Sequence, residues 1–458
     1  MTQRQNSCLI GKHSEMALTE LDSARPVPGY YDSPWPAECG GPRRQKAPRS
    51  KGLGLSSGST LGQRSRHNGE WNVMAVQRAP GEIFLLYNNH INSAEKYGGV
   101  ELIDPVTLET IRRSPRLPSG GHTWCGGIAA HENGFLYFNN GNRCFKLDPD
   151  CGVVAEKRLP RDSAYNSFLV MADGRLVMKN IERDAGRAST FVILDPERLE
   201  QIGPEVAIPE NSMGRIAMDT TTDGQFIYVP GSHHFYRYRY ADGRLSIDQT
   251  WQPRYRTLAD DEQSFSWDSC LSDGGCWFLD NGDNEANAVI FGTRPFGARR
   301  PPRGSVFSGL ASSPQKLHRI DLADPRRAAV LEPFGLPFGS IFSPPAFDPI
   351  RKIAIAFDTG NGRLGALRYL GGARFETLWT RPCRVSMQLV LFLDTGEVAV
   401  NDFRNGFDEI VVFDVETGAE RGRVATESRV ANGMFLSTGW YRDVIYCSIG
   451  TIARVFAE

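Results

Sequence analysis

The sequence predicts an all-β fold built from eight copies of one four-stranded antiparallel unit, and two observations support this. The first is a strand of alternating apolar residues that ends in a tight turn. From residue 71 onward it occurs as WNVMAVQRAPGE, WCGGIAAHENG, NSFLVMADGR, GRIAMDTTTDGQ, FSWDSCLSDGG, IFSPPAFDPIRK, SMQLVLFLDTGE and GMFLSTGWYRD. The second is a turn after each third strand, with forms such as LIDPVTLE, ILDPERLE and VFDVETGA. It returns about every 44 to 49 residues, apart from one longer step, which is the period of propeller blades. We therefore predict an eight-bladed β-propeller.

The end of the repeated region predicts how the ring closes. The chain stops at TIARVFAE, where the third strand of the eighth unit ends, so the last blade lacks its outer strand. An open edge strand would present unpaired backbone groups to other chains. We therefore predict that residues 1–70 form an extended arm that contributes a strand to the last blade. Residues 71–458 then form a single propeller domain.

Two segments outside the repeat are rich in Pro, Gly, Ser and Arg. The arm has basic residues without an acidic neighbour before Glu70, and we expect them to be solvated. They are Arg43, Arg44, Lys46, Arg49, Lys51, Arg64 and Arg66. The second segment is an inserted loop at about 286–315, between the second and third strands of the fifth blade. Its arginines could close over the ring onto an anionic group; they are Arg294, Arg299, Arg300 and Arg303.

Composition and charge exclude several classes of partner. The formal net charge is −1, so we expect neither nucleic acid nor a membrane surface as the partner. No segment approaches the ~18 apolar residues of a membrane helix. The N-terminus has no signal-peptide core, which predicts a cytoplasmic location. Nine scattered cysteines without a CxxC pair indicate reduced, buried thiols.

Polar residues gather at one face of the predicted ring. In a four-stranded blade, the first strand begins and the second strand ends on the same face, which we call the mouth face. Asn, Asp, His and Trp are frequent at these positions, as in NNH, NNGNR, GSHH and DNGDN. Turns on the opposite face, such as ADGR and DTGE, contain ordinary hairpin residues. Because ligands bind where polar groups converge in a concave site, we predict a ligand site on the mouth face.

The candidate catalytic residues are those whose side chains can transfer protons or hold an anion. They are His122, Asp268, His234 and Arg215. Aromatic and amide side chains at equivalent positions are candidates for substrate binding. They are Trp124, Asn166, Trp267, Gln388 and Asn432.

Imidazoles and carboxylates from separate blades also suggest a metal site. Three blades offer a histidine at comparable depth, and the fifth blade adds carboxylates, so one calcium or transition-metal ion is a candidate cofactor. The candidate ligands are His90, His122, His234, Asp280 and Asp283. Capping of Asx-rich turns is the alternative explanation for the carboxylates.

The turns and hairpins resemble those of known propellers. The LDP-x-x-L and FDVETG turns, together with the ADGRL and DTGEV hairpins, resemble the repeats of the quinoprotein and YVTN-type propeller superfamily over most of residues 71–458. The chain is also similar, more weakly, to lactonase and gluconolactonase propellers. The resemblance implies an architecture. The sequence departs from the enzymatic quinoproteins because it has no adjacent cysteine pair and no repeated docking tryptophan.

These features favour a small-molecule enzyme with its active site at the mouth of the propeller. The reaction would be a metal-assisted hydrolysis or a His-based lyase or isomerase reaction, and the ligand could be anionic. Two alternatives stay open, a protein-interaction scaffold without catalysis and a cofactor-dependent redox protein. Clustering of His and Asp on one face favours the enzyme.

Overall fold

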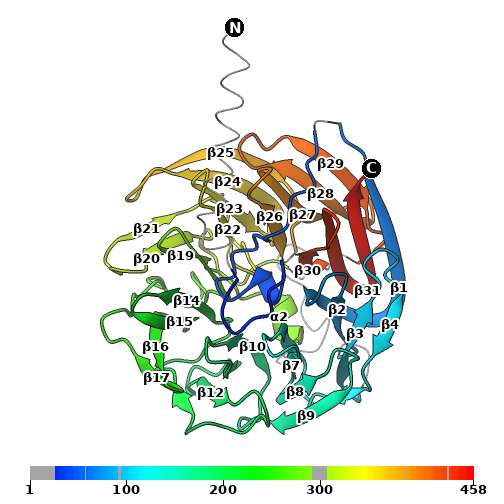
Figure 1. Ribbon diagram of the computed structural model, residues 1–458. Helices are drawn as coiled ribbons and strands as arrows, with labels where there is room; N and C mark the ends of the chain where they lie inside the picture. The colour runs from blue at the N-terminus through cyan, green and yellow to red at the C-terminus, as the bar shows by residue number, and fades with distance from the viewer. Residues whose placement is uncertain (1–25, 57, 91–93, 291–306, 387, 431–432) are drawn as a thin grey trace.

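The computed structural model describes residues 26–56, 58–90, 94–290, 307–386, 388–430 and 433–458. Its strands form a ring of antiparallel sheets (Figure 1). Six sheets have four strands each and are separate blades, and one larger sheet contains two further blades. The structure is therefore the predicted eight-bladed propeller.

The separate blades use consecutive strands, in the order expected from the repeat. The second blade contains β6 (Cys125–Ala130), β7 (Leu136–Asn140), β8 (Arg143–Leu147) and β9 (Val153–Arg158). The third contains β10 (Tyr165–Val170), β11 (Leu176–Asn180), β12 (Thr190–Leu194) and β13 (Val206–Ala207). The fourth contains β14 (Ala217–Thr221), β15 (Gly224–Pro230), β16 (Phe235–Ala241) and β17 (Arg244–Ile247).

The next three blades follow the same order. The fifth contains β18 (Ser269–Ser272), β19 (Gly275–Leu279), β20 (Leu317–Asp321) and β21 (Ala328–Leu331). The sixth contains β22 (Ala346–Asp348), β23 (Ile353–Asp358), β24 (Arg363–Tyr369) and β25 (Phe375–Pro382). The seventh contains β26 (Leu389–Phe392), β27 (Glu397–Arg404), β28 (Phe407–Asp414) and β29 (Glu420–Ala425).

The first and last blades share one strand, and this strand closes the ring. The larger sheet contains β30 (Gly433–Thr438), β31 (Asp443–Ala457), β1 (Leu61–Gln77), β2 (Ile83–Asn88), β3 (Tyr97–Ile103), β4 (Thr110–Arg113) and β5 (Leu117–Pro118). Residues 61–67 of β1 pair with 451–457 of β31, whereas residues 71–77 pair with β2. The N-terminal strand is thus the outer strand of the last blade, as predicted, and it leads directly into the inner strand of the first.

The described remainder of the arm, residues 26–56 and 58–60, runs across the ring on the face opposite the mouth. The backbone N–H groups of Gln77, Ala130 and Leu271, at or near the ends of inner strands, donate to carbonyls of the arm. An inner strand pairs with only one neighbour in its own blade, so these donors would otherwise lack a partner. Figure 1 shows the arm in dark blue at the centre of the ring, where η2 (Glu38–Gly40) lies.

The arm contacts all eight blades, which changes the interpretation of its basic residues. Besides the three contacts above, it reaches the other five blades through Val170, Met218, Ser343, Leu391 and Thr438. Arg44 is 3% exposed and Lys46 is 0% exposed. The expectation that the arm's basic residues are solvated is therefore wrong for these two, because the arm fills the ring instead of leaving it.

The segment between β19 and β20 of the fifth blade contains the inserted loop. Its described part contains α2 (Glu285–Ile290), which lies near the centre of the ring in Figure 1. Residues 291–306, which include the four arginines of the insertion, lie outside the described residues. Among the described residues, no helix has the length and apolar character needed to cross a bilayer.

Candidate functional site

A buried network of two cations and two carboxylates occupies the centre of the ring. Asp268 is fully buried and contacts Arg44 at 3.0 Å and Arg215 at 3.3 Å. Glu38 contacts the same two arginines at 2.7 and 3.1 Å. The Arg215 guanidinium also lies over the Trp124 ring, 5.1 Å from its centroid. We call Glu38, Arg44, Arg215 and Asp268 the central charge cluster.

The central charge cluster joins the arm to the propeller. Burial alone would raise the pKa of Asp268, but Arg44 and Arg215 outweigh burial and hold it below its usual value. Asp268 is thus an ionised partner of two guanidinium groups. The structure places two predicted catalytic residues, Asp268 and Arg215, in a network whose members already bind one another.

Lys179, on β11 of the third blade, is a further cation inside the ring. Its ammonium is fully buried and donates to the carbonyls of Asn180 and Ser212 at 3.0 Å each. Burial lowers its pKa to about 7, and the carboxylate of Asp268 only partly opposes this. Lys179 therefore loses its charge in the folded protein at a pH at which it remains charged in the unfolded chain.

Lys179→Met is expected to remove a pH-dependent part of the stability. The unfolded chain binds more protons than the folded one between pH 7 and about 10, so this group makes stability rise with pH in that range. The wild type should gain about 2 kcal/mol in total relative to the variant between pH 7 and 9, because Lys179 is still half protonated in the folded protein at pH 7. Urea unfolding of both proteins at each pH measures this difference. A difference that does not change with pH would contradict the lowered pKa.

The three predicted histidine ligands do not meet at one point. His90 is buried, and its Nδ1 accepts the backbone N–H of Trp124 at 2.8 Å. Burial, aided by Lys96, lowers the pKa of His90 to about 3, so this imidazole is neutral. His234 Nδ1 lies 2.5 Å from Glu210, and His122 Nε2 lies 3.1 Å from Asp162.

The carboxylates of the fifth blade also have separate roles. Asp280 is fully buried and accepts hydrogen bonds from Gln263 at 2.6 Å and His318 at 3.2 Å. Asp283 contacts Arg183 at 3.5 Å. Within the described ranges, no three His, Cys, Asp or Glu side chains are grouped so that they could hold a metal ion.

Most of the predicted substrate-binding residues are buried in the ring. Trp267 donates to the Gly282 carbonyl at 2.8 Å, and Asn166 donates to the Met213 carbonyl at 2.6 Å. Gln388 accepts from the Cys39 thiol at 3.3 Å. Trp124 is 4% exposed, and Asn432 lies outside the described residues. These four described side chains support the inner walls of the ring.

His122 differs from these residues because it lines an open cavity on the mouth face. The cavity has a volume of about 710 Å³ and lies between the second and third blades. Its lining residues are Lys96, Gly121, His122, Thr123, Asp162, Ser163, Ala164, Ile181, Glu182, Arg183 and Asp184. We call it the His122 cavity.

The hydrogen bond between His122 and Asp162 determines which ring nitrogen of His122 can act as a base. A carboxylate only accepts hydrogen bonds, so the 3.1 Å contact with Asp162 places the ring proton on Nε2. In the neutral imidazole, Nδ1 then carries the lone pair, and no residue in the described part of the chain hydrogen-bonds to it. This arrangement suits a general base that is oriented by a carboxylate.

The neighbouring backbone and side chains also hold this wall in place. Trp124, two residues after His122, has a φ of 116°, which is strained for a residue other than glycine. The bond from its N–H to His90 maintains this conformation. Lys96 donates to the Thr123 hydroxyl at 2.6 Å and adds a cation to the cavity. Sequence reasoning missed Lys96 and Asp162, although Asp162 comes just before a strand that begins at the mouth.

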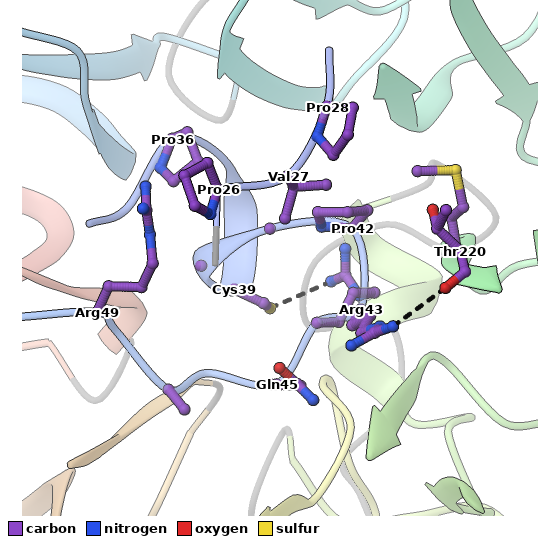
Figure 2. Close-up of a pocket in the computed structure, with 15 residues that line it drawn as sticks. Pro26, Val27, Pro28, Pro36, Cys39, Pro42, Arg43, Gln45, Arg49 and Thr220 are labelled. Carbon is purple, nitrogen blue, oxygen red and sulfur yellow. Dashed lines mark hydrogen bonds between the residues drawn. The ribbon is translucent and has the colours of Figure 1, made fainter. Parts of the chain in front are cut away.

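A second cavity lies on the opposite face and is lined mainly by the arm. It has a volume of about 300 Å³, and Figure 2 shows Pro36, Cys39 and Arg43 among its labelled residues. The Cys39 thiol lies 3.4 Å from an Arg44 nitrogen. Burial raises the pKa of Cys39 to about 11 in spite of Arg44, so this sulfur stays protonated and is a poor nucleophile.

Comparison with known proteins supports the fold. No protein-family model matches the chain, and no curated protein matches its sequence. The solved structures similar to it include the quinohemoprotein alcohol dehydrogenase ADHIIG of Pseudomonas putida HK5. That match has a TM-score of 0.59 and 10% identity, and it covers 94% of this chain and 82% of the dehydrogenase.

Two further similar structures represent an enzyme and a propeller domain. A europium-containing methanol dehydrogenase has a TM-score of 0.53 at 10% identity, with 86% of this chain and 93% of that one covered. The Dos1 propeller has a TM-score of 0.53 at 8% identity, with 86% and 94% covered. At these identities the likeness is one of architecture, because one propeller fold hosts many functions.

Proposed function

We propose that this propeller is an enzyme that removes a proton from a small carboxylate or carbonyl compound in the His122 cavity. The observation that carries the proposal is the contact between His122 and Asp162 at an open cavity of about 710 Å³. That volume is in the range of small-molecule sites. The class of reaction is a lyase or isomerase reaction with His122 as the base.

In the proposed reaction, His122 Nδ1 takes a proton from a carbon next to a carboxylate or carbonyl group. The electron pair of the C–H bond moves toward that group, and the ammonium of Lys96 stabilises the negative charge on its oxygen. The imidazolium that forms is stabilised by Asp162. In an isomerase the proton returns to another carbon, whereas in a lyase the electron pair expels a group from the adjacent carbon.

Asp162 acts as a positioning residue, and its exposure to solvent limits the strength of its ion pair with His122. Its side chain is 81% exposed and that of His122 is 23% exposed. Water screens an exposed ion pair, so the contact contributes little to folding. In the proposed reaction, Asp162 selects the tautomer of His122 that carries its proton on Nε2, and it orients Nδ1 toward the substrate.

His122→Gln is expected to reduce proton abstraction about 100-fold or more, the usual contribution of a general base. The measurement follows exchange of substrate C–H for deuterium in D₂O by proton NMR, over a panel of small 2-hydroxy acids, 2-oxo acids and amino acids. Asp162→Asn should reduce exchange less, by about tenfold, because the base remains.

His67→Gln is the matched control for this experiment. His67 also lies near a carboxylate, 3.1 Å from Glu427, but it is an exposed residue of the closing strand and lies outside the His122 cavity. Its replacement should leave exchange unchanged. Equal exchange in the wild type and His122→Gln, or no exchange of any compound in the wild type, would contradict the proposed function.

A further inference from the structure

A separate cavity on the mouth face lies between the sixth and seventh blades. It has a volume of about 610 Å³. Its lining residues are Asn361, Gly362, Arg363, Arg381, Pro382, Cys383, Arg384, Asp402, Phe403, Arg404, Phe413, Gly418, Glu420 and Arg423. We call it the arginine cavity, since five of these residues are arginines. It shares no lining residue with the His122 cavity.

The topology of the blades brings these arginines to one face. Arg363 begins β24 and Arg404 ends β27, and Arg381 is the next-to-last residue of β25. Arg384 lies in the connection that follows β25. In a blade, the first and third strands begin at the mouth and the second and fourth end there. All four side chains therefore start from the same end of two neighbouring sheets.

The carboxylates of the cavity are already bound by the fifth arginine. Arg423 lies 2.9 Å from Asp402, 2.7 Å from Glu409 and 2.9 Å from Glu420. These hydrogen bonds raise the pKa of Arg423 despite its partial burial. The acidic groups near the cavity are thus held by one guanidinium.

The other four arginines have no ion-pair partner among the described residues. Among the described residues, no carboxylate lies within 4.0 Å of the guanidinium groups of Arg363, Arg384 or Arg404, although the backbone N–H of Arg384 donates to Asp402 at 2.8 Å. The Arg381 side chain donates to the Gly418 carbonyl at 3.2 Å. An outer-strand arginine elsewhere does find a carboxylate, since Arg113, the last residue of β4, lies 2.8 Å from Glu70. Because the whole chain has a net charge of −1, this excess of positive charge is local.

We propose that the arginine cavity binds a small organic molecule that carries a diphosphate group. A guanidinium presents paired N–H donors that match phosphate oxygens, and a diphosphate offers enough charge to offset several cations at once. A single carboxylate would leave most of the cavity's charge unbalanced. The half-buried ring of Phe403 provides an apolar contact for the organic part of the ligand.

The size of the site favours a small molecule over a nucleic acid. A cavity of about 610 Å³ is in the range of small-ligand sites. A nucleic acid would require a longer path of cations and exposed aromatic rings along the surface. The four unpaired arginines instead surround one cavity.

The first test is calorimetric titration of the full-length protein with pyrophosphate at low ionic strength. We expect one site per chain, with a dissociation constant in the micromolar range, about 10–100 μM. In the double variant Arg384→Gln and Arg404→Gln, binding should weaken at least about tenfold. Citrate, a carboxylate polyanion, should bind more weakly than pyrophosphate.

Two controls separate this effect from a general loss of charge or of folding. The control is the double variant Arg198→Gln and Arg244→Gln, which removes two exposed arginines from the third and fourth blades. It should leave pyrophosphate binding unchanged. Thermal unfolding should give the same midpoint for the two double variants. If the cavity variant is less stable, the single variants Arg384→Lys and Arg404→Lys retain the charge and should show a smaller loss of affinity.

Four results would overturn the proposal. They are no binding of pyrophosphate by the wild type, equal affinity in the cavity and control variants, tighter binding of citrate, and tighter binding of an oligonucleotide that depends on the same arginines. The test is independent of the proposed function, because His122→Gln should bind pyrophosphate like the wild type.

Discussion

Asp268→Ala is expected to lower the free energy of unfolding by about 3–5 kcal/mol, because it leaves buried cations without their partner. Asp268 is fully buried and lies within 3.3 Å of both Arg44 and Arg215. Without it, Glu38 is the only carboxylate left in the central charge cluster. Urea unfolding of the wild type and the variant measures the change.

The pH dependence of Asp268→Ala gives a second measurement. The pKa of Asp268 is lower in the folded protein than in the unfolded chain, where it is about 3.9. Its contribution is therefore fully present above that value and is lost as the pH falls through the folded pKa. The wild type should lose this contribution below about pH 4, and the variant has none to lose.

An exposed aspartate is the control for this variant. Asp150 lies 3.7 Å from Arg112, and its side chain is 83% exposed. Asp150→Ala should leave the unfolding midpoint unchanged, since water solvates both groups. A similar loss of stability in the two variants would show that burial of the central charge cluster is not the cause.

Removal of residues 1–67 is expected to prevent folding into a soluble monomer. This truncation deletes the strand that pairs with residues 451–457 and exposes that edge of the last blade. An unpaired edge strand promotes association with other chains. Size-exclusion chromatography and the soluble fraction on expression measure the effect, and a stable soluble monomer of residues 68–458 would contradict it.

Two less severe truncations separate the contribution of ring closure to stability from that of the arm. Residues 61–458 keep the closing strand but lose the arm's contacts with all eight blades, including the bonds to Gln77 and Leu271. Each lost hydrogen bond contributes about 1 kcal/mol, so stability should fall by about 5 kcal/mol or more. Residues 26–458 keep every contact described for the arm and should behave as the full chain does.

The repeat and the closure of the ring could be predicted from the sequence because they depend on local patterns. Alternating apolar residues and tight turns specify strands and hairpins within a few residues. The missing outer strand followed from where the last unit ends. The mouth-face position of His122 also followed, since it depends only on the direction of the first strand.

The hydrogen bonds and ion pairs of the predicted site residues could not be predicted from local sequence patterns. Asp268, Arg215 and Gln388 begin inner strands like His122, but the arm brings Glu38, Cys39 and Arg44 against them from more than 150 residues away. No pattern of neighbouring residues in the sequence predicts such a contact. The same limit explains why Arg44 and Lys46 were expected to be solvated.

The sequence by itself thus determined the eight blades, the closing strand and the face on which polar residues gather, because each depends on neighbours along the chain. The tertiary structure decided which polar residues support the ring and which line cavities. It buried Asp268 and Arg215 among charges from the arm, and it left His122 and the arginines of the sixth and seventh blades at open cavities. The physical reason is that a polar group's role depends on the partners it meets in space.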